Sequence, residues 1–108
     1  LYEHLLSAKG IGVLSLAFSS EPENIQVISG IKPADYAKKL GVGCARVNIP
    51  PSGKPDSVQE IERTARQVCG LVGPGSVAYI HPDCGLRDTP TGLALKTLEN
   101  LVAAASRL

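Results

Sequence analysis

The sequence predicts an α/β domain with parallel strands, and three observations support this prediction. Apolar runs of strand length alternate with helix-like stretches roughly every 30 residues, the spacing of βαβ units. These runs are continuous, as in strands buried on both faces of a parallel sheet, and turn residues bound each of them. Three strands with their helices form either a small doubly wound sheet or an arc of a barrel. The order of elements alone does not choose between the two.

The first half of the chain contains one clear strand. Residues 1–9 read as the end of an amphipathic helix whose apolar side holds Leu5, Leu6 and Ala8. Residues 13–18 are apolar and of strand length. Residues 25–31 are ambiguous, because they are β-branched and apolar but closed quickly by glycine and proline. Residues 33–40 predict a helix with proline in its first turn and glycine at its end.

The second half contains two strands and two longer helices. Residues 42–49 predict a strand that ends at a Pro-Pro pair. Asp56 or Ser57 can cap the following helix, with Glu60 placed to close a capping box on Ser57. The apolar face of that helix consists of Val58, Ile61, Ala65 and Val68.

The last strand and helix follow a glycine-rich turn. Residues 76–81 predict the third strand, and residues 93–108 predict a strong helix. The apolar side expected for that helix holds Leu95, Leu98, Leu101, Val102 and Ala105.

Composition excludes several classes of function. The formal net charge of +1 and the scattered basic residues give no reason to expect nucleic acid or an anionic membrane as a partner. No apolar run approaches the roughly 18 residues that a membrane-spanning helix needs, and no secretory signal is visible. Three well-separated cysteines do not form a disulfide framework, so a reducing cytoplasm is the expected compartment.

The start of the chain is unusual for a complete protein. It opens at Leu1, contains no methionine, and begins inside what reads as a helix. We therefore expect residues 1–108 to be part of one domain that continues in a longer chain.

Candidate chemistry lies where strands end, because parallel α/β folds gather their functional residues at the carboxyl ends of strands. Cys84 follows the third strand between Asp83 and a glycine. Spacing alone leaves it open as a metal ligand, a nucleophile or a small buried side chain. Cys44, within a strand, and Cys69, near a helix end, are expected to be structural. His81 and Cys84 do not form a recognised metal-binding spacing.

Pro82-Asp-Cys-Gly-Leu-Arg87, followed by Lys96-Thr-Leu-Glu-Asn-Leu-Val-Ala-Ala-Ala105, resembles the closing segment of cobalamin-independent methionine synthases and their shorter archaeal relatives. This resemblance is specific over residues 76–108 and looser over the rest. It implies the last three βα units of a (β/α)₈ barrel, the fold of the superfamily that these enzymes share with uroporphyrinogen decarboxylase.

The resemblance also implies a zinc-dependent transfer of a methyl or alkyl group to or from a thiol. Cys84 would be a zinc ligand and Asp83 an orienting group. The substrates implied are a small-molecule thiol and a methyl or alkyl donor. Asp83 and Asn48 are weak candidates for substrate contact by position.

Three departures from the family pattern bear on activity. No His-x-Cys motif is present, so further zinc ligands must come from outside this chain. Ala17 stands where the family has a zinc-binding glutamate, and Asn48 stands where its methionine synthases have a proton-transferring histidine. A relative that uses another thiol or another donor, such as a coenzyme M alkyltransferase, fits these departures better.

Two alternatives stay open beside the enzyme. The chain can be a non-catalytic partial barrel that associates with its missing portion, with a partner chain or with a second copy, since open strand edges are rarely left uncovered. It can also be a small doubly wound binding domain, although no glycine-rich phosphate loop follows any strand.

Overall fold

The computed structural model describes all residues 1–108 and contains one parallel sheet of three strands in the order β1-β2-β3. The strands are β1 (Val13–Ala17), β2 (Lys39–Ala45) and β3 (Val77–Pro82). The helices are α1 (Tyr2–Ser7), α2 (Asn24–Gly30), α3 (Val58–Val72) and α4 (Thr91–Ala105), with 3₁₀ turns η1 (Pro33–Tyr36) and η2 (Pro74–Ser76). No helix is both long enough and apolar enough to span a membrane.

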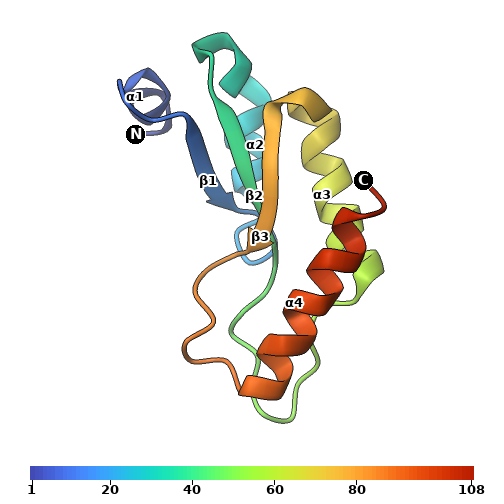
Figure 1. Cartoon of the computed structure of the whole chain (residues 1–108). Coiled ribbons are helices and arrows are strands. Elements are labelled where there is room, and N and C mark those ends of the chain that lie inside the picture. The colour runs from blue at the N-terminus through green and yellow to red at the C-terminus, as the bar shows by residue number, and fades with distance from the viewer.

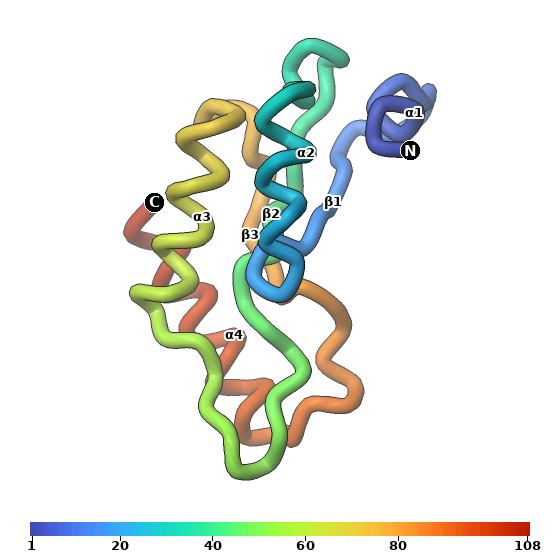
Figure 2. The backbone as a smooth tube through the Cα atoms, turned by 180° about the vertical axis from the view of Figure 1, so that it is seen from behind, coloured from blue at the N-terminus to red at the C-terminus, as the bar shows by residue number.

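The three helices that follow strands pack on one side of the sheet. In Figure 1, α2 lies behind β2, and Figure 2 shows the same helix in front of β2 from the opposite side; α3 packs against β2, and α4 lies beside α3 next to β3. Their apolar side chains form one core with the central strand: Phe18, Ile28, Leu40, Val42, Cys44, Ala45, Ile61, Ala65, Val68, Val72, Leu101 and Ala104. A doubly wound sheet places helices on both faces, whereas a barrel places them all outside. The chain therefore has the α/β architecture of a partial (β/α)₈ barrel, as expected.

The opposite face of the sheet carries small and polar residues. The Ser15 hydroxyl lies 2.9 Å from the Tyr79 hydroxyl, across the strand between them. This contact requires Gly41 below it, because a Cβ at that position would lie 2.6 Å from both Ser15 Oγ and the Tyr79 ring. Tyr79 remains 48% exposed, and no helix of this chain covers this face.

The segment around residue 37 differs from the sequence prediction. Residues 33–40 were expected to form one helix, but the structure has only the 3₁₀ turn η1 there, and Lys39 already belongs to β2. Ala37 adopts a left-handed conformation at φ 57°, which ends the helical turn. The Lys39 N–H then donates to Gly12 O at 3.0 Å and opens the strand pairing with β1.

The structure also assigns the ambiguous residues 25–31 and corrects the bounds of the strand predicted over 42–49. The ambiguous residues 25–31 fall almost entirely in the helix α2. The strand expected over 42–49 begins at Lys39 and ends at Ala45. It ends there because the Arg46 N–H donates to the Asp56 carboxylate at 2.9 Å rather than to a neighbouring strand.

The start of α3 agrees with its prediction. The Glu60 N–H donates to Ser57 Oγ at 3.2 Å, and the Ser57 N–H donates to Glu60 Oε2 at 2.7 Å. This reciprocal capping box leaves the Asp56 side chain free for another role.

The buried side of α4 was predicted wrongly. Leu95, Leu98 and Val102 are 58%, 42% and 72% exposed, and of the five expected core residues only Leu101 is buried. The helix instead buries two polar residues, and each of them has a hydrogen-bond partner within the protein. Thr97 Oγ1 donates to a carbonyl of the same helix, and Asn100 Nδ2 donates to Asp56 O at 2.9 Å. Leu95, Leu98 and Val102 consequently form an apolar stripe that this chain leaves exposed.

Candidate functional site

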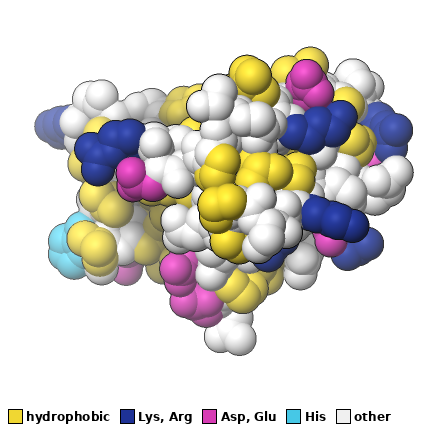
Figure 3. Space-filling model, turned by 90° about the horizontal axis from the view of Figure 1, so that it is seen from below, with side chains coloured by type: hydrophobic (Ala, Val, Ile, Leu, Met, Phe, Trp, Pro, Cys, Tyr) yellow, Lys and Arg dark blue, Asp and Glu magenta, His cyan; other side chains and the backbone are white.

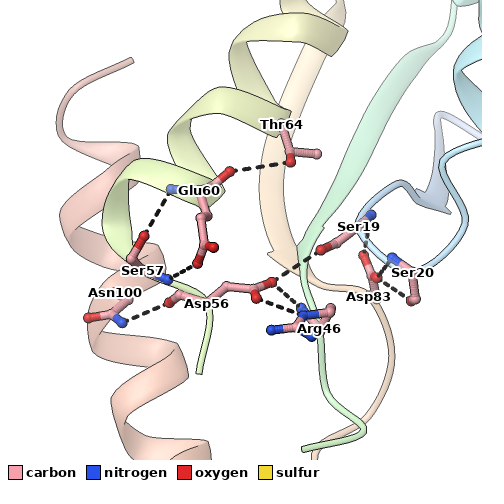
Figure 4. A network of polar contacts seen from close by, with 9 residues as sticks. All are labelled: Ser19, Ser20, Arg46, Asp56, Ser57, Glu60, Thr64, Asp83 and Asn100. Carbon is pink, nitrogen blue, oxygen red and sulfur yellow. Dashed lines mark hydrogen bonds and ion pairs between the residues drawn. The ribbon is translucent and has the colours of Figure 1, made fainter. Parts of the chain in front are cut away.

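The carboxyl ends of the three strands meet at one edge of the sheet. The Phe18 N–H donates to Gly43 O and the Asp83 N–H donates to Ala45 O, each at 2.8 Å, so the pairing continues just past the ends of β1 and β3. Five polar residues that follow these ends, or precede α3, form a connected set that we term the strand-end network: Ser19, Ser20, Arg46, Asp56 and Asp83. Figure 4 shows these side chains pointing toward one another.

Asp83 is held by the turn after β1. Its Oδ1 accepts from the Ser19 N–H at 3.3 Å, and its Oδ2 accepts from the Ser20 N–H at 2.6 Å and from the Ser20 hydroxyl. Two successive backbone N–H groups that point at one carboxylate form an anion-binding nest. Both carboxylate oxygens are therefore engaged, which favours an orienting role for Asp83 over metal ligation or substrate contact.

Asp56 is the buried hub of the network and was missed by sequence reasoning, which considered it only as a helix cap. It is 4% exposed. Its Oδ1 accepts from Arg46 Nε at 2.7 Å, and its Oδ2 accepts from the Arg46 N–H at 2.9 Å and Ser19 Oγ at 3.1 Å. Burying a charge is costly unless it is paired and hydrogen-bonded, and this carboxylate meets both conditions.

The three cysteines occupy different environments. Cys84 is exposed at the carboxyl end of β3, and no disulfide involves it. Cys44 is buried in β2, where burial, and then the charge of Asp83, raises the pKa of its thiol to about 12. Burial also raises the pKa of the half-buried Cys69 thiol. Since the thiolate is the form that binds metal or attacks an electrophile, Cys84 is the accessible thiol of this chain.

No group of three or more histidine, cysteine, aspartate or glutamate side chains lies close enough to hold a metal ion. The Cys84 thiol could provide one zinc ligand, but the side chains near it do not provide the others. Asp83 is engaged by the serine turn. His81 Nδ1 lies 2.5 Å from Pro82 O, and its buried Nε2 has no partner. The donor set thus fits zinc only if further ligands come from outside these residues.

The remaining predicted positions, Asn48 and Ala17, lie at the same edge without joining the network. Asn48 is exposed beyond the end of β2. Ala17 is the last residue of β1 and offers no ligand atom on its side chain. Glu21 is exposed in the loop that follows β1, where a hydrogen bond with Glu23, and then the charge of Glu23, raises the pKa of Glu21.

Neither sign of charge dominates this end of the molecule. Viewed from the loops beyond the strand ends, hydrophobic groups lie between scattered basic and acidic side chains (Figure 3). This view agrees with the small net charge of +1. A nucleic-acid-binding surface would instead present clustered basic residues.

Comparison with known proteins places these features in a family. The family model described as "Cobalamin-independent synthase, Catalytic domain" matches residues 4–107. A methionine synthase of Methanothermobacter marburgensis is 35% identical over 97 residues, and that of Methanothermobacter thermautotrophicus is 33% identical over 95 residues. These alignments cover 89% and 88% of this chain.

The same relatives are much longer than the matched segment. The chain spans 29% of each of the two methionine synthases. It also matches 10% of a 5-methyltetrahydropteroyltriglutamate–homocysteine methyltransferase of Bacillus thuringiensis, at 31% identity over 80 residues. With nearly its whole length matched by the family model, this chain belongs to the cobalamin-independent synthase family and corresponds to part of its catalytic domain.

Proposed function

We propose that this chain is part of a zinc-dependent enzyme that transfers a methyl or alkyl group to or from a thiol, with Cys84 as one zinc ligand. The observation that carries the proposal is the position of Cys84. In a chain of this family it is an exposed thiol at the carboxyl end of a strand, where barrel enzymes place their functional residues.

Cys84 and Asp83 would divide the work at this edge. Cys84 Sγ would bind the metal as a thiolate, and Asp83 would fix the loop that carries it. Zinc held there would lower the pKa of a coordinated substrate thiol, so that the thiolate is available at neutral pH. Asn48 is exposed at the same edge and is the remaining candidate for substrate contact.

The substrates would be of the kind that the names of the relatives give. Those names include homocysteine, a thiol, and 5-methyltetrahydropteroyltriglutamate, a methyl donor. Here Ala17 and Asn48 replace the glutamate and histidine expected from the family resemblance. The proposal therefore includes a substrate thiol other than homocysteine, or a donor other than 5-methyltetrahydropteroyltriglutamate.

The other zinc ligands and most of the substrate pocket would come from residues beyond these 108. The relatives are more than three times as long as the matched segment, and the present residues provide one ligand only. Residues 1–108 would accordingly be the last three βα units of a single barrel domain.

A second candidate is a non-catalytic partial barrel that associates with a partner chain or with the missing portion of the barrel. The uncovered sheet face and the exposed stripe of Leu95, Leu98 and Val102 on α4 favour it. Both β1 and β3 also present an open strand edge, and such edges are normally covered.

Zinc content and methyl transfer, measured on the protein at the length that its gene encodes, test the proposal. We expect about one zinc ion per chain and loss of most zinc in Cys84→Ser, with Cys69→Ser as a matched control that keeps it. Zinc retained in full by Cys84→Ser would overturn the assignment of Cys84. A protein without zinc or methyl transfer that light scattering finds bound to a partner would support the second candidate.

A further inference from the structure

The loop that carries Cys84 is fastened at two points. At its start, Asp83 is bound by the turn after β1. At its end, the buried Thr89 donates from Oγ1 to Val47 O at 2.5 Å. Only five residues separate these anchors, and Gly85 follows the thiol directly. The placement of the Cys84 thiol therefore depends on the anchor nearest to it, which is Asp83.

Ser20 supplies the shorter contacts to that anchor. Both its N–H and its hydroxyl donate to Asp83 Oδ2, whereas Ser19 contributes one longer bond of 3.3 Å to Oδ1. The Ser20 hydroxyl is the only side-chain group that donates to Asp83. Removing it leaves Asp83 Oδ2 with one donor fewer.

The turn that presents Ser20 is itself fixed from the other side. Ser19 Oγ donates to the buried Asp56 carboxylate at 3.1 Å. The Asp56 backbone carbonyl accepts from Asn100 in α4. The serine turn is therefore linked through Asp56 to helix α4, although the Ser20 side chain itself is exposed (Figure 4).

We propose that Ser20 is a positioning residue for Cys84 that acts through the Asp83 carboxylate. The inference rests on the proposed function, in which Cys84 binds zinc. Groups that orient a metal ligand without touching the metal typically contribute 10- to 100-fold in metal affinity, roughly the range expected here. A ligand held within about 0.5 Å of its working position needs such support.

The test compares zinc affinity, by competition with a chelator, among variants of the protein at its encoded length. We expect Ser20→Ala to weaken zinc binding about 10- to 100-fold, and Ser20→Thr, which keeps a hydroxyl, to restore most of it. Ser29→Ala is the matched control, because the Ser29 hydroxyl is exposed and donates only to Ile25 O within α2. It should leave zinc affinity unchanged.

A second set of variants separates positioning from general loss of structure. If Ser20 acts through Asp83, the double variant Ser20→Ala/Asp83→Ala should bind zinc no more weakly than Asp83→Ala alone. The thiolate-to-metal absorption band of the cobalt-substituted protein should shift in Ser20→Ala and not in Ser29→Ala. Thermal unfolding of the two single serine variants should remain alike.

The outcomes distinguish this inference from the proposed function. Loss of zinc in Cys84→Ser, with Ser20→Ala binding zinc as Ser29→Ala does, would overturn the role of Ser20 and leave Cys84 as a ligand. Additive effects of Ser20→Ala and Asp83→Ala would also overturn it. Full zinc binding in Cys84→Ser would overturn the proposed function itself.

Discussion

The two faces of the sheet differ in how completely this chain covers them. One face packs Leu40, Val42 and Cys44, each no more than 1% exposed, against the helices. The other presents Ser15, across a glycine, to a half-exposed Tyr79. The covered face forms the apolar core of this chain, whereas the open face lacks helices, as the interior face of a barrel does.

This difference separates the source of stability from the source of function. The covered face holds the apolar core. The strand-end network and Cys84 lie beyond the ends of the strands and are held by hydrogen bonds instead. Substitutions on the two faces should therefore have different consequences, and four experiments test this contrast.

The largest effect is expected in the covered core. Leu40→Ala should reduce the free energy of unfolding by about 2–5 kcal/mol, because it leaves a cavity where the side chain is fully buried. Tyr79→Phe on the open face removes one hydroxyl contact and should cost about 1 kcal/mol or less. Urea denaturation measures both. Equal losses would contradict the division between the faces.

The second effect is a fall in stability in alkali. Burial raises the pKa of the Cys44 thiol from its ordinary value of 9.0, which the unfolded chain keeps, to about 12 in the folded protein. Above pH 9 the unfolded state binds fewer protons, so stability should fall as pH rises, by up to about 1.4 kcal/mol per pH unit. Cys44→Ala should show a shallower decline in urea midpoints between about pH 9 and 11. An identical decline would mean that Cys44 is not the buried group responsible.

The third effect compares two glycines. A Cβ at Gly43 would lie 2.9 Å from both Asp83 Oδ1 and the backbone Leu16 O, so Gly43→Ala should cost about 1–3 kcal/mol. Gly70→Ala in α3 meets nothing within 4 Å and should stabilise by about 0.5–1 kcal/mol. Thermal unfolding distinguishes the two signs. A neutral Gly43→Ala would show that the sheet opens more easily than its packing implies.

The smallest effect concerns the cap of α3. Ser57→Ala removes one half of the capping box and should cost about 1 kcal/mol in urea denaturation. Ser52→Ala, at an exposed loop position, is the control and should change little. A Ser57→Ala variant as stable as the control would mean that Asp56 takes over the cap and leaves the strand-end network.

Local signals in the sequence were sufficient to locate the three strands and the start of α3, although the bounds of β2 differ from those predicted. Continuous apolar runs marked the three strands, and the Ser57–Glu60 box marked the start of the helix. Residues 33–40 failed because a single left-handed residue, Ala37, ends the helical turn, and no local pattern announces it.

Contacts between distant segments could not be anticipated in this way. The buried side of α4 is set by Asn100, which binds Asp56 44 residues away. The resemblance identified Cys84, but the support from Ser20 depends on two loops 63 residues apart in sequence. One signal for the contact between Ser20 and Asp83 was present in the sequence. Both residues are polar and follow strands, and the carboxyl ends of strands share one edge of a parallel sheet.

The most direct test of the account is X-ray absorption at the zinc edge, on the wild type and on Cys84→Ser at the encoded length. The account predicts that the wild type has one sulfur more than the variant at about 2.3 Å from zinc. The same number of sulfur ligands in both proteins would contradict it, because Cys84 would then lie outside the metal centre.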